Sequence, residues 1–89
     1  MTYVLICHTV ADYPRWKRAY DAHAGVRRSA GGRGGRLFRS APRPKEVTLL
    51  LRWSDLGRAR KFTRSAALRK AMKAAGVRGK ADVQFLRET

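Results

Sequence analysis

Two histidines and one arginine are the residues of this sequence that could move a proton and hold an anion: His8, His23 and Arg27. Arg27 follows His23 by four residues, so the two side chains share a face if this segment is helical. A guanidinium close to an imidazole disfavours protonation of the imidazole. A neutral histidine (His8 or His23) could then act as a general base on a phenol or enol, and Arg27 could stabilise the resulting oxyanion. The alternative for His23 is a partly exposed polar position at the rim of its helix.

Large apolar side chains could enclose the planar ring of such a substrate. Trp16 and Tyr20 recur at helical spacing with His23, so we expect them on the same helical face. The alternative for Trp16 and Tyr20 is ordinary packing in the core. We expect a substrate pocket lined by Trp16, Tyr20, Phe38, Trp53, Phe62 and Met72.

The sequence offers little that could bind a metal ion or a common cofactor. Two histidines cannot complete a four-ligand site, and the sequence contains no GxGxxG run. The one cysteine, Cys7, lies in the apolar run YVLIC, which predicts a buried thiol without a disulfide partner or an activating neighbour. We therefore expect neither a metal nor a cofactor.

The composition predicts one small and strongly basic domain. The 89 residues suffice for a single domain, expected to span residues 1–89. The formal net charge is +15, from 21 Lys+Arg and 6 Asp+Glu, which favours polyanionic partners. The basic positions run from Arg15 to Arg87 without one dominant block, so a general bias spread over solvated faces is the alternative. Neither an apolar run of the roughly 20 residues that span a membrane nor a signal peptide is recognisable, and we expect a cytoplasmic protein.

The stretch GGRGGR, residues 31–36, has the composition of a flexible RNA-binding segment. Its position favours a turn instead. Gly31 and Gly32 can end a helix, because glycine accepts a left-handed backbone, and Gly34 and Gly35 can lead the chain into a strand. One short copy between folded elements is poor evidence for an RNA-binding tail.

Hydrophobic periodicity predicts four strands and two helices. Asp12 and the Ser54–Asp55 pair are suitable N-caps, and Ser65 is expected to interrupt or bend the second helix. The expected strands span residues 3–10, 36–40, 46–53 and 82–87, and the expected helices run from Tyr13 to about Ala30 and from the Ser54–Asp55 cap to Gly76.

The order β-α-β-β-α-β predicts a ferredoxin-like α+β fold, a four-stranded antiparallel sheet with two helices on one face. The RNA-recognition fold shares this topology and stacks bases on aromatic residues of its two central strands. Here the third strand, KEVTLLLRW, has no glycine and no paired aromatics in its body, and the first strand offers only Tyr3. A nucleic-acid-binding domain is therefore only a minor alternative.

The first and third strands carry apolar residues on both parities, so the sheet face away from the helices should also be apolar. Tyr3, Leu5 and Cys7 are expected on one side of the first strand, and Val4 and Ile6 on the other. An exposed apolar sheet face marks a partner site. The simplest partner is a second copy, packed sheet against sheet in a two-fold dimer. We therefore expect a homodimer.

Four segments together resemble the dimeric α+β barrel superfamily, and within it the small proteins of the antibiotic biosynthesis monooxygenase type. They are YVLICHTVADYPRW, GGRGGRLFR, EVTLLLRWSDLGRARKFTRSAALRKAM and DVQFLRE. The most specific part is the strand ending in Trp53, the Ser54–Asp55 cap, and the following helix with Phe62, Ser65, Leu68 and Met72. The resemblance covers nearly the whole chain.

The resemblance implies a dimeric α+β barrel whose ligand pocket lies between the sheet and the helices of each subunit. It further implies a cofactor-independent monooxygenase in which the carbanion of a small aromatic or polyketide-like substrate reacts directly with oxygen. Similar oxygenases often carry an asparagine that orients the substrate at the position of His8. The alternative for His8 is a histidine at a strand end, satisfied by a backbone carbonyl.

Haem-degrading relatives bind iron through a histidine that falls at Met72 here and have a pocket tryptophan at Phe62, so haem degradation is not expected. A non-catalytic dimer that binds a ligand or a partner is the alternative function.

Overall fold

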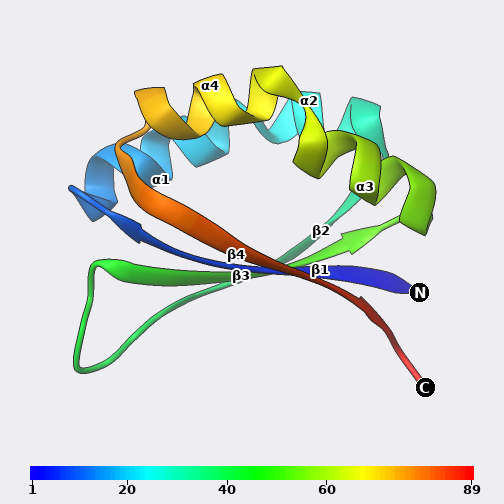
Figure 1. The fold of residues 1–89 in the computed structure, drawn as a ribbon, viewed down its shortest axis with the longest axis horizontal. Helices are drawn as coiled ribbons and strands as arrows, with labels where there is room; N and C mark the ends of the chain where they lie inside the picture. The colour runs from blue at the N-terminus through cyan, green and yellow to red at the C-terminus, as the bar shows by residue number, and fades with distance from the viewer.

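A four-stranded antiparallel sheet, covered on one face by helices, makes up the fold (Figure 1). The computed structural model describes all 89 residues. The strand order is β2-β3-β1-β4, and no helix has the length and apolar character needed to cross a lipid bilayer. This architecture confirms the predicted ferredoxin-like α+β class. The elements are β1 (Thr2–Val10), α1 (Tyr13–Ala22), α2 (Ala24–Ala30), β2 (Gly32–Arg39), β3 (Glu46–Trp53), α3 (Leu56–Arg64), α4 (Ala66–Ala74) and β4 (Val77–Arg87).

The two central strands, β1 and β3, pair in an unbroken register from Thr2 opposite Trp53 to Thr9 opposite Glu46. Residues that stand opposite each other point to the same side of a sheet, and successive residues alternate between its sides. One parity of both strands therefore forms a continuous apolar layer under the helices. The largest fully buried side chains all come from this layer: Val4, Val10, Val47 and Trp53.

Each of the two predicted helices is divided in two. The break at Ser65 confirms the prediction for the second helix. The Ser65 hydroxyl accepts a hydrogen bond from the Leu68 N–H (3.1 Å) and donates one to the Phe62 carbonyl (2.8 Å). Ser65 thus ends α3 and serves as the N-cap of α4.

The prediction of one continuous helix over residues 13–30 is wrong at His23. The His23 backbone leaves the helical region there (φ −94°, ψ 9°), so α1 ends and α2 begins at Ala24. The guanidinium of Arg27 reaches back to this break and donates a hydrogen bond to the Tyr20 carbonyl (2.8 Å). The Tyr20 carbonyl, which also accepts a hydrogen bond from the His23 N–H (3.2 Å), thereby gains a second donor from the side chain of a residue in α2.

Two strands begin earlier than predicted. β2 begins at Gly32 instead of Arg36, because the glycine-rich stretch pairs with β3 through a bulge in which two residues, Arg33 and Gly34, stand opposite Arg52. β4 begins at Val77 instead of residue 82, because its first residues pair with the end of β1 beyond a register shift. The pattern of apolar residues does not reveal either irregularity.

Gly35 lies against the backbone of β3. A Cβ atom at this position would overlap the Leu50 carbonyl oxygen and lie 2.9 Å from the Cα of Leu51. Because those atoms belong to a paired strand, they cannot move aside without cost. Glycine is therefore required here by close packing.

We expect Gly35→Ala to lower the free energy of unfolding by about 1–3 kcal/mol, the usual cost of overpacking. Gly25→Ala is the matched control, since a Cβ atom there meets no other atom within 4 Å. In α2 this control should stabilise the protein by about 0.5–1 kcal/mol, because alanine restricts the unfolded chain. Urea unfolding of the two variants measures both effects, and an equal response at the two positions would contradict the packing argument.

Candidate functional site

A cavity of about 280 Å³ lies between the inner face of the sheet and the helices, and we call it the apolar cavity. Of its 17 lining residues, 13 are hydrophobic, which suits an apolar ligand. The sheet contributes Ile6, His8, Leu49 and Leu51. The helices contribute, among others, Trp16, Tyr20, His23, Arg27, Phe62 and Met72.

His8 is the polar group in the floor of the apolar cavity. Its parity on β1 turns the ring toward the helices, and the side chain is only 8% exposed. Neither Nδ1 nor Nε2 has a hydrogen-bond partner. The expected alternative, an imidazole satisfied by a backbone carbonyl, is therefore not what the structure contains. Burial lowers the pKa of His8 below its ordinary value of 6.5, so the ring is neutral at pH 7.

Aromatic rings form the wall beside His8. The His8 and Trp16 rings form a T-shaped pair with their centres 5.5 Å apart. Trp16, itself 3% exposed, stacks on Tyr20 at 5.2 Å. Burial is the main cause that raises the pKa of Tyr20, so its phenol keeps its proton at neutral pH. A flat ring bound in the cavity would meet the same kind of surface that these rings offer each other.

Arg27 lies over the Tyr20 ring at the side of the cavity, with the guanidinium carbon 3.6 Å from the ring centre. Burial lowers the pKa of Arg27, a shift that nearby Tyr20 and Asp21 oppose. The guanidinium of Arg27 is held by the ring and the carbonyl of Tyr20, and its predicted influence on the His23 imidazole stays a prediction. Arg27 nevertheless lines the same cavity as His8.

His23 lines the cavity from the junction of α1 and α2, where its side chain is exposed. Its Nδ1 lies 2.9 Å from the Ala19 carbonyl oxygen. An exposed ring that is hydrogen-bonded to its own helix matches the polar-rim interpretation of His23. Of the two histidines, His8 has the environment of a buried base.

Two of the predicted pocket residues lie elsewhere. Phe38 stands opposite Thr48 on the face of the sheet away from the helices and is 49% exposed, so its prediction as a wall of this pocket is wrong. Trp53 is 1% exposed and does not line the apolar cavity, although its ring packs on Phe62 at 4.8 Å. The sequence interpretation missed Ile6 and Leu49 as lining residues. Ile6 lies two residues before His8 on the same side of β1, and Leu49 stands opposite Ile6 on β3.

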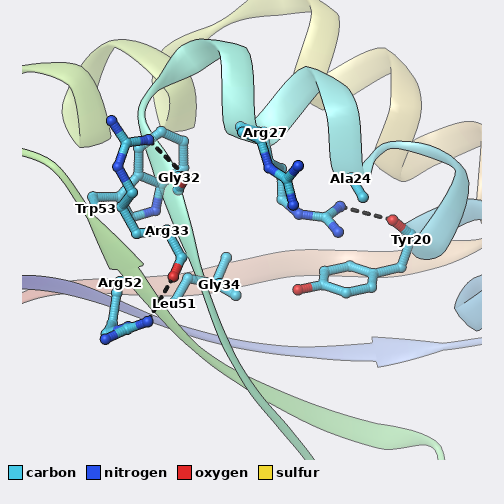
Figure 2. A pocket seen from close by; sticks show the side chains of 10 residues that line it. Tyr20, Ala24, Arg27, Gly32, Arg33, Gly34, Leu51, Arg52 and Trp53 are labelled. Atoms are coloured by element: carbon cyan, nitrogen blue, oxygen red, sulfur yellow. Dashed lines mark hydrogen bonds between the residues drawn. The ribbon is translucent and has the colours of Figure 1, made fainter.

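A second hollow of about 640 Å³ adjoins the first, and we call it the arginine cleft (Figure 2). Tyr20, Arg27 and Leu51 line both spaces. Figure 2 shows side chains converging on the cleft from the helical layer and from the strands. Its remaining lining residues are Ala24, Arg28, Gly32, Arg33, Gly34, Arg52 and Trp53.

Solved structures reveal what this architecture is similar to. A proposed antibiotic biosynthesis monooxygenase from Bordetella bronchiseptica superposes with a TM-score of 0.80 at 17% identity, over 99% of this chain and 96% of the other. The chain has the antibiotic biosynthesis monooxygenase fold. A variant of SnoaB, a cofactor-independent oxygenase from Streptomyces nogalater, shares this fold with a TM-score of 0.75 at 12% identity, over 98% and 91% of the two chains.

The likeness is one of structure. No family model matches the sequence, and no curated protein matches it. The resemblance predicted from the sequence is therefore confirmed for the fold. Sequence identities below 25% do not extend it to function. Catalytic roles for His8, His23 and Arg27 stay predictions.

The burial of His8 leads to a defined pH dependence of stability. As pH falls through about 6.5, the unfolded chain binds a proton at position 8 before the folded chain does. As the pH falls from 6.5 to the lower pKa of the folded state, His8 therefore lowers the free energy of unfolding. Below that pKa the loss of stability levels off. Urea unfolding of wild type and His8→Gln between about pH 7.5 and 5 should show the steeper decline in the wild type. Parallel curves would contradict the lowered pKa, because the carboxylates contribute equally to both proteins.

Proposed function

We propose that this protein is a cofactor-independent monooxygenase that acts on a small phenolic or enolic aromatic substrate, of the polyketide-like kind, in the apolar cavity. The observation that carries this proposal is His8, a buried and neutral imidazole without a partner, in the floor of a cavity with aromatic walls. A buried polar group without a partner costs stability, so a substrate hydroxyl that supplies the missing partner is favoured there. SnoaB is described as a cofactor-independent oxygenase and has the same fold, which supports the reaction class.

His8 is the proposed general base. Its neutral ring accepts the proton of the substrate hydroxyl, and the imidazolium formed is stabilised by the oxyanion beside it. Arg27, which lines the same cavity, stabilises the negative charge of the oxyanion from the side. Trp16 and Tyr20 form the aromatic side of the substrate cavity, and Phe62 and Met72 complete its apolar wall.

The deprotonated aromatic ring of the substrate is the electron donor for oxygen. Its electron-rich carbon, conjugated with the oxyanion, forms a C–O bond with O₂, and the terminal oxygen of the peroxide takes up a proton. Loss of the hydrogen on that carbon then breaks the O–O bond and expels water, leaving a carbonyl. The sum is one phenol plus one O₂ giving one quinone and one water, so the substrate loses four electrons and O₂ gains four.

The proposal includes a homodimer through the face of the sheet away from the helices. Tyr3, Leu5 and Leu50 are only half-buried on this face, and Phe38 is 49% exposed. The register places all four side chains on the same side of the sheet. Packing this face against a second copy would remove several large side chains from water, at about 1.5–3 kcal/mol for each one fully buried.

Oxygen uptake with a hydroxynaphthalene as substrate tests the reaction. We expect one O₂ per quinone formed, and a fall in kcat on the order of 10²–10⁴-fold in His8→Gln, the usual contribution of a general base. Arg27→Gln should also lower kcat, while Arg18→Gln, an equal change of charge on the exposed side of α1, should not. Thermal melting confirms that the variants are folded. Tight binding of the ring without turnover would contradict the oxygenase and support a ligand-binding module.

Sedimentation measures the proposed assembly. Wild type should sediment as two chains of 10.1 kDa, and Leu50→Asp should shift it toward one chain, because a carboxylate would be buried without a partner. Ala22→Asp, at an exposed position on α1, is the control that should keep the dimer. A wild type that stays monomeric at micromolar concentration would exclude this arrangement.

A further inference from the structure

The arginine cleft holds an uncompensated concentration of positive charge. Arg27, Arg28, Arg33 and Arg52 line it, and none of the six acidic residues of the chain does so. The three ion pairs of the molecule join Lys17 to Asp21, Arg43 to Glu46 and Arg58 to Asp55, and leave these four arginines unpaired. Four guanidiniums around one hollow repel one another unless an anion lies between them.

Most hydrogen-bond donors of these arginines are also uncommitted. A guanidinium carries five N–H donors in a fixed planar arrangement. Arg27 donates to the Tyr20 carbonyl (2.8 Å), Arg33 to the Gly32 carbonyl (2.9 Å) and Arg52 to the Arg33 carbonyl (2.9 Å). These bonds fix the directions of three guanidiniums and leave their other donors free. The side chain of Arg28 makes no hydrogen bond within the protein, so it is free to turn toward a ligand.

Glycines keep the strand side of the cleft open. Gly32 and Gly34 line it where β2 passes through the bulge. Gly34 has a backbone φ of +86°, which disfavours any other residue, and a Cβ atom there would project into open space. A ligand can therefore approach the backbone of β2 closely. The sequence GGRGGR thus supplies both a cationic side chain, Arg33, and the room beside it.

We propose that the arginine cleft binds the phosphate group of a small phosphorylated molecule. Guanidiniums recognise carboxylate and phosphate oxygens through paired hydrogen bonds. Four positive charges exceed what one carboxylate can balance, and a phosphate, with a charge of about −1.5 to −2 at pH 7, or a diphosphate balances them better. Because Tyr20, Arg27 and Leu51 are shared with the apolar cavity, the apolar part of the same molecule can occupy that cavity.

The phosphates of a nucleic acid could make the same hydrogen bonds, but the cleft suits a nucleic acid less well than it suits a small phosphorylated molecule. Single-strand binding sites combine a basic groove with exposed aromatic rings on which bases stack. The aromatic residues of this cleft are Tyr20, which is covered by Arg27, and Trp53, which is 1% exposed. A concave site without a stacking surface favours a small molecule.

Calorimetric titration with inorganic pyrophosphate tests the proposal without any reference to oxygenase activity. We compare wild type with Arg28→Gln/Arg33→Gln, and with Arg18→Gln/Arg78→Gln, whose exposed arginines line neither hollow. Both double variants lower the formal net charge from +15 by two, to +13, so a purely general attraction affects them equally. Salt of about 0.15 M screens exposed charges beyond roughly 8 Å.

The expected result is binding of one pyrophosphate per chain, weakened on the order of a hundredfold in the cleft variant and little changed in the control. Absence of binding, or equal weakening in the two variants, would overturn the proposal. A short mixed-sequence single-stranded DNA is titrated in parallel. Tighter binding of the DNA than of pyrophosphate, lost only in the cleft variant, would also overturn it by identifying a nucleic acid as the source of the phosphate. Neither Arg28 nor Arg33 belongs to the proposed oxygenase machinery, so failure of that activity leaves this result intact.

Discussion

The register between β1 and β3 is the constraint on which the site depends. It places His8 opposite Val47, with both side chains directed toward the helices. A shift of one residue would turn every side chain of β1 to the other face and move His8 out of the cavity. Both strands are apolar on both parities, so alternation alone does not select the register. Trp53 determines which face of β3 packs under the helices, because its ring, among the largest apolar surfaces available to a side chain, is almost wholly buried there.

Positive charge is the second constraint, and some of the arginines lie over aromatic rings. The three ion pairs all join residues three or four apart on the surface, where such pairs contribute little. Arg27 lies on Tyr20 and Arg39 on Tyr13, at 3.6 and 4.0 Å from the ring centres. A guanidinium is weakly hydrated and planar, so it can cover an aromatic face without losing all its donors. The arginine cleft is where this arrangement leaves several charges together without an anion.

The sequence predicts the class of fold, because that class depends on patterns that are local. Strands with apolar residues on both parities, the serine cap at Ser65 and the left-handed glycine at Gly31 are all visible in the order of residues. The position of Phe38 was not predictable in the same way. Leu37 and Phe38 are adjacent and both apolar, and the register set by the bulge at Arg33 and Gly34 decides which of them faces the helices.

The residues of the candidate site were predictable where their positions follow the regular spacing of a strand or helix. They were not predictable where the helix is broken. Trp16 and Tyr20 line the same cavity, as their helical spacing indicates, and His8 lines it from the sheet. The pairing of His23 with Arg27 assumed an uninterrupted helix, and the helix is broken at His23. The hydrogen bond from the Arg27 side chain to the Tyr20 carbonyl spans this break. No feature of the sequence around His23 announces that contact.

The state of His8 links the fold to the proposed chemistry. A buried imidazole without a partner in the protein resists protonation, because no neighbouring protein group shares the charge. A base of this kind accepts a proton readily only when the donor becomes an anion at the same place, since the two opposite charges then stabilise each other in a medium of low dielectric constant. The same burial that makes His8 a poor base toward water therefore selects for a substrate whose own negative charge forms beside the ring. Phenols and enols, whose charge spreads into a flat apolar skeleton, fit both that electrostatic requirement and the aromatic wall formed by Trp16 and Tyr20.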